Sequence, residues 1–240
     1  MYDIEINQMS AFYGTVCALE NIDLNIRSKE FLGIVGPNGG GKTTLLKVIM
    51  GFIKPLKGTV IINDKKIIGY VPQHTTFQRS FPINVMDVVL MGRPNKGAWF
   101  QRPSHSEVEY AKKILEKLGL LDLKYRQIGE LSGGQLQKVL IARALMMDSD
   151  ILILDEPNAH LDTETRKDII EILKELKDHK TILMVTHSIE DIFEYIDSLA
   201  VVNQRVERYS KEEMMDKKIT QSGYIYTGNP FIDFQSHGRQ

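Results

Sequence analysis

The sequence predicts an α/β fold in which strands and helices alternate along most of the chain. Short apolar runs of strand length alternate with amphipathic stretches of helix length, which is typical of a sheet flanked by helices. A glycine-rich loop joins one apolar strand to a helix, and a long stretch with helix signals interrupts the alternation. At 240 residues with 42% hydrophobic content, the chain is large enough for one globular unit with an inserted lobe.

The N-terminal part is expected to contain an antiparallel strand and then a buried one. Ile22, Leu24 and Ile26 alternate with polar residues, as in a strand with one buried face. Residues 31–35 are continuously apolar, which indicates a strand that is buried on both faces. Two packed sheets are therefore expected.

Residues 78–145 are predicted to form an inserted helical lobe. Ser104 with Glu107 is typical of a capping box, and apolar residues follow on one helix face: Val108, Ala111, Ile114, Leu115 and Leu118. Strands resume at residues 151–154, 181–185 and 199–202, and a helix over 163–177 turns Ile169, Ile172, Leu173 and Leu176 inward. We expect a single domain over residues 1–240, with a core of about 1–77 and 146–209, the lobe of about 78–145, and a weakly patterned tail of about 210–240.

Composition argues against several classes of protein. Lys+Arg (30) and Asp+Glu (31) nearly cancel, so the basic excess of a nucleic-acid-binding protein is missing. No apolar run approaches the ~20 residues of a membrane span, and the first residues lack the pattern of a secretion signal. The single cysteine, Cys17, cannot form an internal disulfide. We expect no nucleic-acid partner and a location in the cytoplasm.

The strongest motif is the phosphate loop, residues 36–43, which matches G-x-x-x-x-G-K-[ST] between a strand and a helix. Glycines allow several backbone N–H groups to point at one phosphate, and the helix N-terminus adds partial positive charge. Lys42 is suited to the β- and γ-phosphates, the Thr43 hydroxyl to Mg²⁺, and Thr44 to the α-phosphate. The predicted nucleotide-binding residues here are Gly36, Pro37, Asn38, Gly39, Gly40, Gly41, Lys42, Thr43 and Thr44.

Two carboxylates follow the apolar strand at residues 151–154. Asp155 and Glu156 would lie at the carboxyl edge of the sheet, where the phosphate loop also lies. Asp155 is suited to hold Mg²⁺ directly or through water, and Glu156 to polarise the water that attacks the γ-phosphate. Together with the phosphate loop, this pair predicts hydrolysis of a nucleoside triphosphate.

A second anion site is predicted at the signature, residues 131–135 (LSGGQ), which begins another helix. Its binding groups are the hydroxyl of Ser132 and the N–H groups of Gly133, Gly134 and Gln135. On this pentapeptide the chain resembles the ATP-binding-cassette (ABC) ATPases. The resemblance implies a P-loop NTPase core with an N-terminal antiparallel β subdomain and an inserted α-helical subdomain. It also implies that each signature completes the ATP site of a second cassette in a head-to-tail pair, with two nucleotides between the two cassettes. One cassette per chain therefore implies a second cassette subunit, expected to be an identical chain.

The resemblance covers residues 2–206 and implies roles for further residues. Gln73, in YVPQ, matches a glutamine that contacts Mg²⁺ or the attacking water. Asp162 matches an acidic loop between the two ATP sites, although nearby Asn158 and His160 differ from the commoner residues. His187, in MVTHS, matches a histidine that contacts the γ-phosphate.

One position has competing interpretations, and another departs from the pattern of the family. Tyr13 matches the aromatic residue that stacks on adenine, with Phe12 as the competing candidate and core packing of Tyr13 as the other reading. Gly40 stands where the family usually has Ala, Ser or Cys, which adds conformational freedom to the loop without a clash.

Segments of the helical lobe narrow the resemblance. Three segments resemble the ATPases of manganese/zinc-type metal-ion importers, with ferric-siderophore and cobalamin importers as the nearest relatives. These segments are FPINVMDVVLMGR, WFQRPS and QIGELSGGQ. This implies membrane permease subunits, an extracytoplasmic substrate-binding protein, and a position at the cytoplasmic face of the membrane. Candidates for the apolar lining of a groove for the permease, with core packing as the alternative, are Phe81, Val85, Val88, Val89 and Met91.

Two other functions are disfavoured. A soluble cassette ATPase acting on DNA or ribosomes would carry a long coiled coil or two cassettes, and neither is in the sequence. An inactive regulatory cassette is disfavoured because Lys42, Asp155, Glu156 and His187 are all present. The resemblance implies an ATPase that uses ATP and Mg²⁺ to power import of a divalent metal ion.

Overall fold

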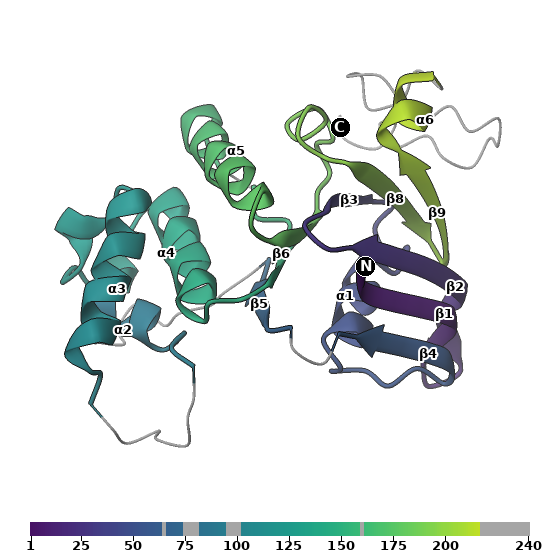
Figure 1. The fold of residues 1–240 in the computed structure, drawn as a ribbon, viewed down its shortest axis with the longest axis horizontal. Helices are drawn as coiled ribbons and strands as arrows, with labels where there is room; N and C mark the ends of the chain where they lie inside the picture. Colours follow the sequence, from purple (N-terminus) through teal and green to yellow (C-terminus); the bar gives the residue numbers. More distant parts are fainter. Residues whose placement is uncertain (64–65, 74–81, 95–101, 159–160, 217–240) are drawn as a thin grey trace. The chain divides into compact units, whose positions relative to one another are not determined.

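The computed structural model describes residues 1–63, 66–73, 82–94, 102–158 and 161–216 (Figure 1). Contacts divide the chain into two compact units, one of Met1–Lys66 with Leu176–Gln240 and one of Ile67–Glu175. The second unit holds two strands of the expected core together with the helices of the expected lobe.

The first unit contains a three-stranded antiparallel sheet of order β2-β1-β4. Its strands are β1 (Tyr2–Tyr13), β2 (Val16–Arg27) and β4 (Lys57–Ile62). On β2, Ile22, Leu24 and Ile26 are buried while Asp23 between them is exposed. The predicted antiparallel strand with one buried face is therefore confirmed.

Parallel strands form the second sheet of this unit, in which β7 (Thr181–Val185), β3 (Phe31–Val35) and β8 (Ser198–Asn203) are neighbours. Every residue of β3 and β7 is buried, as the continuous apolar runs predict. β9 (Arg205–Ser210) adds an antiparallel edge to β8. Helix α1 (Lys42–Ile49) follows β3, so the phosphate loop lies at the carboxyl end of a buried parallel strand.

A short helix begins the segment that was expected to be a weakly patterned tail. α6 (Lys211–Asp216) follows β9 directly and packs against β8 and β9. Met214 on α6 is fully buried, so one apolar anchor holds a helix that has too few residues for a clear sequence pattern. The rest of the expected tail, residues 217–240, lies outside the described residues.

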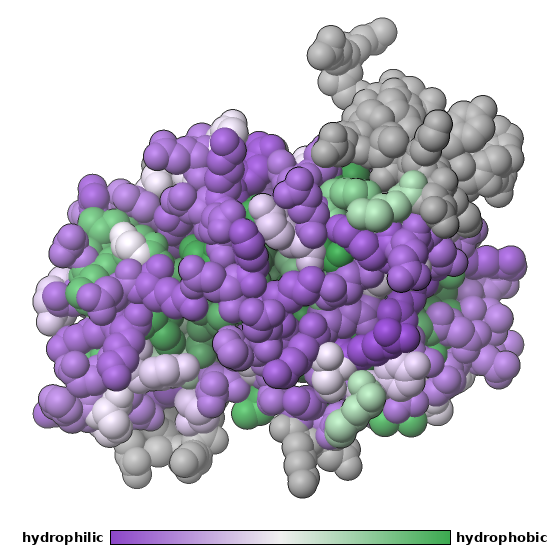
Figure 2. Space-filling view, turned by 45° about the horizontal axis from the view of Figure 1, so that its top comes forward, coloured by the Kyte–Doolittle hydropathy of each residue, from purple (hydrophilic) through white to green (hydrophobic). Residues whose placement is uncertain are grey.

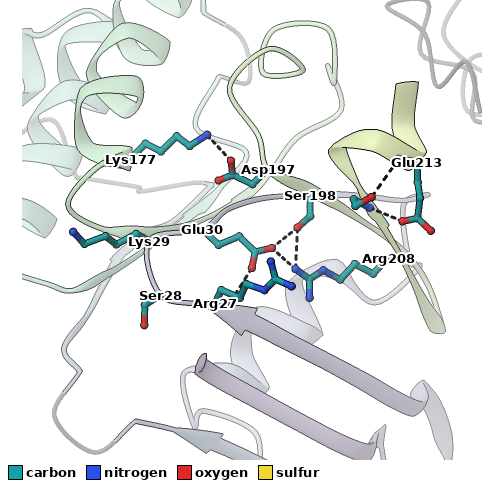
Figure 3. Close-up of a pocket in the computed structure, with 10 residues that line it drawn as sticks. Arg27, Ser28, Lys29, Glu30, Lys177, Asp197, Ser198, Arg208 and Glu213 are labelled. Carbon is teal, nitrogen blue, oxygen red and sulfur yellow. Dashed lines mark hydrogen bonds and ion pairs between the residues drawn. The ribbon is translucent and has the colours of Figure 1, made fainter. Parts of the chain in front are cut away.

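A polar cluster joins the strands at the opposite, amino end of β3 (Figure 3). Glu30 is buried, and its carboxylate accepts hydrogen bonds from the Ser198 hydroxyl and the Arg27 backbone N–H. Nη2 of Arg208, on β9, lies 2.5 Å from Oε1 of Glu30, and Nη1 donates to the carbonyl of Asn25 on β2. One guanidinium therefore ties β9 both to the start of β3 and to the antiparallel sheet.

The second unit contains the parallel strands β5 (Ile68–Val71) and β6 (Ile151–Asp155). Its helices are α2 (Val85–Leu90), α3 (His105–Lys117), α4 (Gly133–Met146) and all but the last two residues of α5 (Thr163–Lys177), with short 3-10 turns at Leu121–Leu123 and Ile128–Glu130. Figure 1 shows α2, α3 and α4 grouped together, and all three pack on one another. The predicted helix over 163–177 and the predicted inward residues Ile169, Ile172, Leu173 and Leu176 are confirmed.

The predicted capping box of α3 is also confirmed. The Ser104 hydroxyl accepts from the Glu107 backbone N–H, and the Glu107 carboxylate accepts from the Ser104 N–H at 2.7 Å. Ala111, Ile114 and Leu115 of α3 are buried, as the helical spacing requires.

One interpretation of the helical lobe is wrong. Val85, Val88 and Val89 were candidates for the lining of a groove, but each is 0% exposed because α2 packs against α4 and α3. They are core residues, whereas Met91 is exposed. Phe81 lies outside the described residues.

The visible surface is mostly polar (Figure 2), with apolar residues in small separate patches. Within the described parts of the chain, no helix combines the length and the apolar character that a membrane span requires.

Candidate functional site

The phosphate loop packs against the strands around it within the first unit. A Cβ atom on Gly40 would lie 2.7 Å from the carbonyl oxygen of Val202 on β8, and one on Gly41 would lie 2.7 Å from Cδ2 of Leu19 on β2. Gly41 also has φ +103, a left-handed conformation that glycine adopts without strain. The loop therefore packs closely against β8 and β2. This close packing requires glycine at positions 40 and 41.

Lys42 places a positive charge inside this loop. Its side chain is buried, and Nζ donates to the carbonyl oxygens of Gly36 at 2.9 Å and Pro37 at 3.1 Å. Gly41 is the N-cap residue of α1, so no capping side chain accepts a hydrogen bond from the first turn of the helix. A buried ammonium next to the N-terminus of a helix fits the phosphates of a nucleotide.

The two threonines after Lys42 are placed differently. Thr43 is exposed at the start of α1, whereas Thr44 is buried. An exposed hydroxyl beside the lysine fits a cation that accompanies the phosphates, because Mg²⁺ prefers oxygen ligands.

Tyr13 lies at the tip of the β1–β2 hairpin, where the residue is 49% exposed. Val16, its partner in the strand register, is also exposed. Phe12, the competing candidate, is half-buried and is paired with Cys17 on β2. The exposed Tyr13 ring is available to stack on a planar base, which core packing would have prevented.

His187 follows β7 in the first unit. Thr186 before it is buried, and its hydroxyl accepts from the Ser188 backbone N–H at 3.0 Å. This local turn leaves the His187 side chain exposed just after the carboxyl end of the strand.

The two acids of the second unit have different surroundings. Asp155 is buried at the end of β6, and its negative charge adds to burial in raising the pKa of the Tyr70 hydroxyl on neighbouring β5. Glu156 is half-buried and has φ +49, which is uncommon for a residue other than glycine. The chain thus turns sharply after Asp155, so that the Asp155 carboxylate is buried and the Glu156 carboxylate is partly exposed.

Gln73 and Glu156 are in direct contact. Nε2 of Gln73 donates to Oε2 of Glu156 at 2.6 Å. The amide must donate, because an ionised carboxylate only accepts. Oε1 of Gln73 is therefore the amide atom suited to a cation.

The signature begins α4 with a capping box. The Ser132 hydroxyl accepts from the Gln135 backbone N–H at 3.2 Å, and the Gln135 amide oxygen accepts from the Ser132 N–H at 3.1 Å. Ser132 and Gly133 are exposed, whereas Gly134 is buried. The helix N-terminus is thus presented on the surface, with its first turn already in place.

Asp162 caps the next helix. Its carboxylate accepts from the Thr165 backbone N–H at 2.9 Å and from the Thr165 hydroxyl at 2.7 Å. These bonds lower the pKa of Asp162, the backbone bond most strongly. Thr165 was not singled out from the sequence, although an aspartate directly before a helical stretch is a recognisable N-cap residue.

The side chains predicted to hold a metal ion all offer oxygen atoms, which fits Mg²⁺ rather than a softer metal. Thr43, Gln73 and Asp155 offer a hydroxyl, an amide and a carboxylate oxygen, and Mg²⁺ takes few protein ligands beside phosphate and water. Among the described residues, no group of three or more His, Cys, Asp or Glu side chains is placed to hold a metal ion.

Comparisons with known proteins agree on the family. The family model described as ABC transporter matches residues 19–159. The high-affinity zinc uptake system ATP-binding protein ZnuC of Bacillus subtilis (strain 168) is 42% identical over 211 residues, covering 83% of this chain and 88% of that protein. The manganese transport system ATP-binding protein MntB of the same organism is 39% identical over 212 residues, covering 85% of each chain.

Solved structures agree on the fold. An inward-facing metal-chelate type ABC transporter matches with a TM-score of 0.82 at 26% identity, covering 90% of this chain and 86% of that chain. A dimeric ATP-binding cassette in a post-hydrolysis state, bound to ADP and phosphate, matches with a TM-score of 0.73 at 28% identity, covering 87% and 98%. The predicted α/β cassette fold is thereby confirmed, and the chain belongs to the ABC transporter family as an ATP-binding subunit.

Proposed function

We propose that this subunit hydrolyses ATP with Mg²⁺ and that hydrolysis powers the import of a divalent metal ion of the manganese or zinc type. The names of the two bacterial relatives, a zinc uptake and a manganese transport ATP-binding protein, support this class of cargo. The segments of the helical lobe that resemble such ATPases support it from the sequence.

The phosphate loop is proposed to bind the triphosphate of ATP. Lys42 supplies its ammonium to the β- and γ-phosphates in exchange for the carbonyls of Gly36 and Pro37. Tyr13 supplies an exposed ring to the adenine. The backbone N–H groups of the remaining loop residues and the side chains of Thr43 and Thr44 complete the set.

Glu156 is proposed as the base that polarises the attacking water, and Gln73 as the residue that orients it. The 2.6 Å hydrogen bond between the two is the observation that carries the hydrolytic assignment, because it places an oriented carboxylate beside a second polar group. Asp155 and Thr43 would hold Mg²⁺, which supplies charge neutralisation at the phosphates when bound. His187 would contact the γ-phosphate.

The subunit is proposed to act in a head-to-tail pair of cassettes. The exposed N-terminus of α4, with Ser132, Gly133, Gly134 and Gln135, supports a role toward the nucleotide of a second cassette, and a dimeric solved cassette supports the pairing. Asp162 would lie between the two ATP sites. The cassette is proposed to divide into a core of about 1–77 and 146–209 and a lobe of about 78–145. The mutual packing of α2, α3 and α4 supports this division.

Membrane permease subunits are proposed to hold the pair at the cytoplasmic face of the membrane, with an extracytoplasmic protein that delivers the metal ion. We propose no nucleic-acid partner, because acidic and basic residues nearly balance. The similarity to a metal-chelate type transporter favours one second candidate, the ATPase of a siderophore or cobalamin importer.

The Glu156→Gln variant tests hydrolysis. It should bind ATP with unchanged affinity, lose about 10²- to 10⁴-fold in phosphate release, and accumulate as an ATP-bound dimer in size-exclusion chromatography. Near-normal phosphate release would overturn the role of Glu156.

Cargo is tested by uptake. Cells expressing the subunit with its permease should accumulate manganese or zinc in a manner that the Glu156→Gln variant abolishes. Accumulation of a ferric siderophore or of cobalamin instead would establish the second candidate.

A further inference from the structure

Thr165 makes contacts in two directions at the start of α5. Its hydroxyl donates to Oδ2 of Asp162, and its backbone N–H donates to Oδ1. Both oxygens of that carboxylate are thereby fixed by one residue.

The methyl group of Thr165 faces the signature. A Cβ atom on Gly134 would lie well inside contact distance of Cγ2 of Thr165, 2.9 Å from Oγ1 and 3.1 Å from Cβ. Gly134 is a helical residue, where glycine is less favourable than alanine by about 0.5–1 kcal/mol. The close approach of Thr165 gives a physical reason for glycine at this position.

Two further contacts join α4 to α5 and to the residues just before α5. Nζ of Lys138 lies 2.8 Å from Oδ2 of Asp168, one turn farther along α4. A Cβ on Gly133 would lie 3.8 Å from Cδ2 of Leu161. The starts of the two helices are therefore neighbours in the same unit, and a side chain is excluded at Gly134 but not at Gly133.

We propose that Thr165 is a positioning residue that fixes the signature and Asp162 relative to each other. The inference rests on the proposed function, in which both groups act toward a second cassette. A displacement of α4 at Gly134 pushes on the methyl of Thr165, and the hydroxyl of the same side chain passes the displacement to Asp162. The signature and the acidic loop then engage the second cassette as one rigid element.

Complementary substitutions test this contact in the purified full chain. Gly134→Ala should lower kcat for ATP hydrolysis by about 10- to 100-fold, because misplacement by about 1 Å has effects of this size. ATP affinity should stay within about twofold, since the phosphate loop belongs to the other unit. Thr165→Ser keeps the hydroxyl but removes the methyl that meets Gly134, so alone it should lower kcat by about three- to tenfold. Combined with Gly134→Ala, whose added methyl takes the vacated space, it should recover at least about tenfold in kcat relative to Gly134→Ala alone.

Two further variants separate positioning from helix packing. Thr165→Val keeps the shape and removes the donor to Asp162, so it should lose kcat and should not restore Gly134→Ala. Lys138→Met removes the neighbouring ion pair and should leave kcat within about twofold. An equal loss in Lys138→Met would assign the effect to general packing of α4 on α5 and overturn the proposal.

The pairing of cassettes provides a second readout. In a Glu156→Gln background, Gly134→Ala should reduce the ATP-trapped dimer, and the added Thr165→Ser should restore it. If the background variant itself forms no dimer, the proposed function fails. If it does, and Thr165→Ser restores neither kcat nor dimer, only the role of Thr165 is overturned.

Discussion

In the phosphate loop, Gly40 approaches Val202 so closely that a Cβ atom on the glycine would lie 2.7 Å from the Val202 carbonyl oxygen. The same atom would lie 3.0 Å from the carbonyl oxygen of Pro37. Both neighbours are backbone atoms, which cannot rotate out of the way as a side chain does. A methyl group at position 40 would therefore force the loop itself to move.

Gly40→Ala should destabilise the chain by about 1–3 kcal/mol and weaken ATP binding, because the loop must move away from β8. Urea unfolding and nucleotide titration measure the two effects. Gly51→Ala is the control: Gly51 has φ +75 and open space around it, so alanine adds only backbone strain of about 1–2 kcal/mol, with ATP affinity unchanged. Equal ATP affinities for Gly40→Ala and wild type would contradict the packing argument.

Arg208→Met should destabilise the chain by about 3–5 kcal/mol, because it leaves the buried Glu30 carboxylate without its guanidinium. Adding Glu30→Gln should recover part of the loss, since the unpaired charge is then gone. Arg205 offers a matched control on the same strand: its ion pair with Glu20 is exposed at both ends, so Arg205→Met should cost at most about 1 kcal/mol. Similar losses for the two arginines in urea unfolding would refute the distinction.

Gln73→Met should lower kcat by about 10- to 100-fold, because the thioether keeps the length of the side chain but cannot donate to Glu156. ATP affinity should be unchanged. Steady-state hydrolysis and nucleotide titration separate the two quantities. The exposed Gln127→Met is the control for the substitution itself, and a kcat equal to that of Gln127→Met would remove Gln73 from the mechanism.

Local signals in the sequence predict much of this fold. The strand Phe31–Val35, the helix Thr163–Lys177 and the capping box of Ser104 with Glu107 lie where the apolar period and the cap residues place them. The site motifs are local too, since each lies within a few consecutive residues. A single stretch of sequence is therefore enough to identify them.

Contacts between distant segments are not predictable in this way. Val85, Val88 and Val89 have the pattern of an apolar surface as much as of a core, and only the packing of α2 on α4 and α3 decides between them. The contact between Gly134 and Thr165 likewise depends on how two helices meet, which no motif encodes. The pairing of Gln73 with Glu156 joins residues 83 positions apart.

Asp162 should give the stability of the chain a specific dependence on pH. Its carboxylate accepts two hydrogen bonds from Thr165, which lower its pKa in the folded chain. The unfolded chain therefore binds more protons at this residue than the folded chain does. The resulting stabilisation is fully present above the unfolded pKa of about 4 and is lost as the pH falls through the lower pKa of the folded chain.

Asp162→Asn isolates this contribution, because asparagine also caps helices well but carries no charge. Urea unfolding of wild type and variant should differ most at pH 7, and the difference should shrink as the pH is lowered below about 4. Asp178→Asn, at an exposed residue just beyond α5, controls for the loss of one negative charge. A difference between wild type and Asp162→Asn that stays constant from pH 7 to pH 3 would show that the carboxylate charge does not stabilise α5. Asp162 would then be available to a second cassette without any cost to the helix that it precedes.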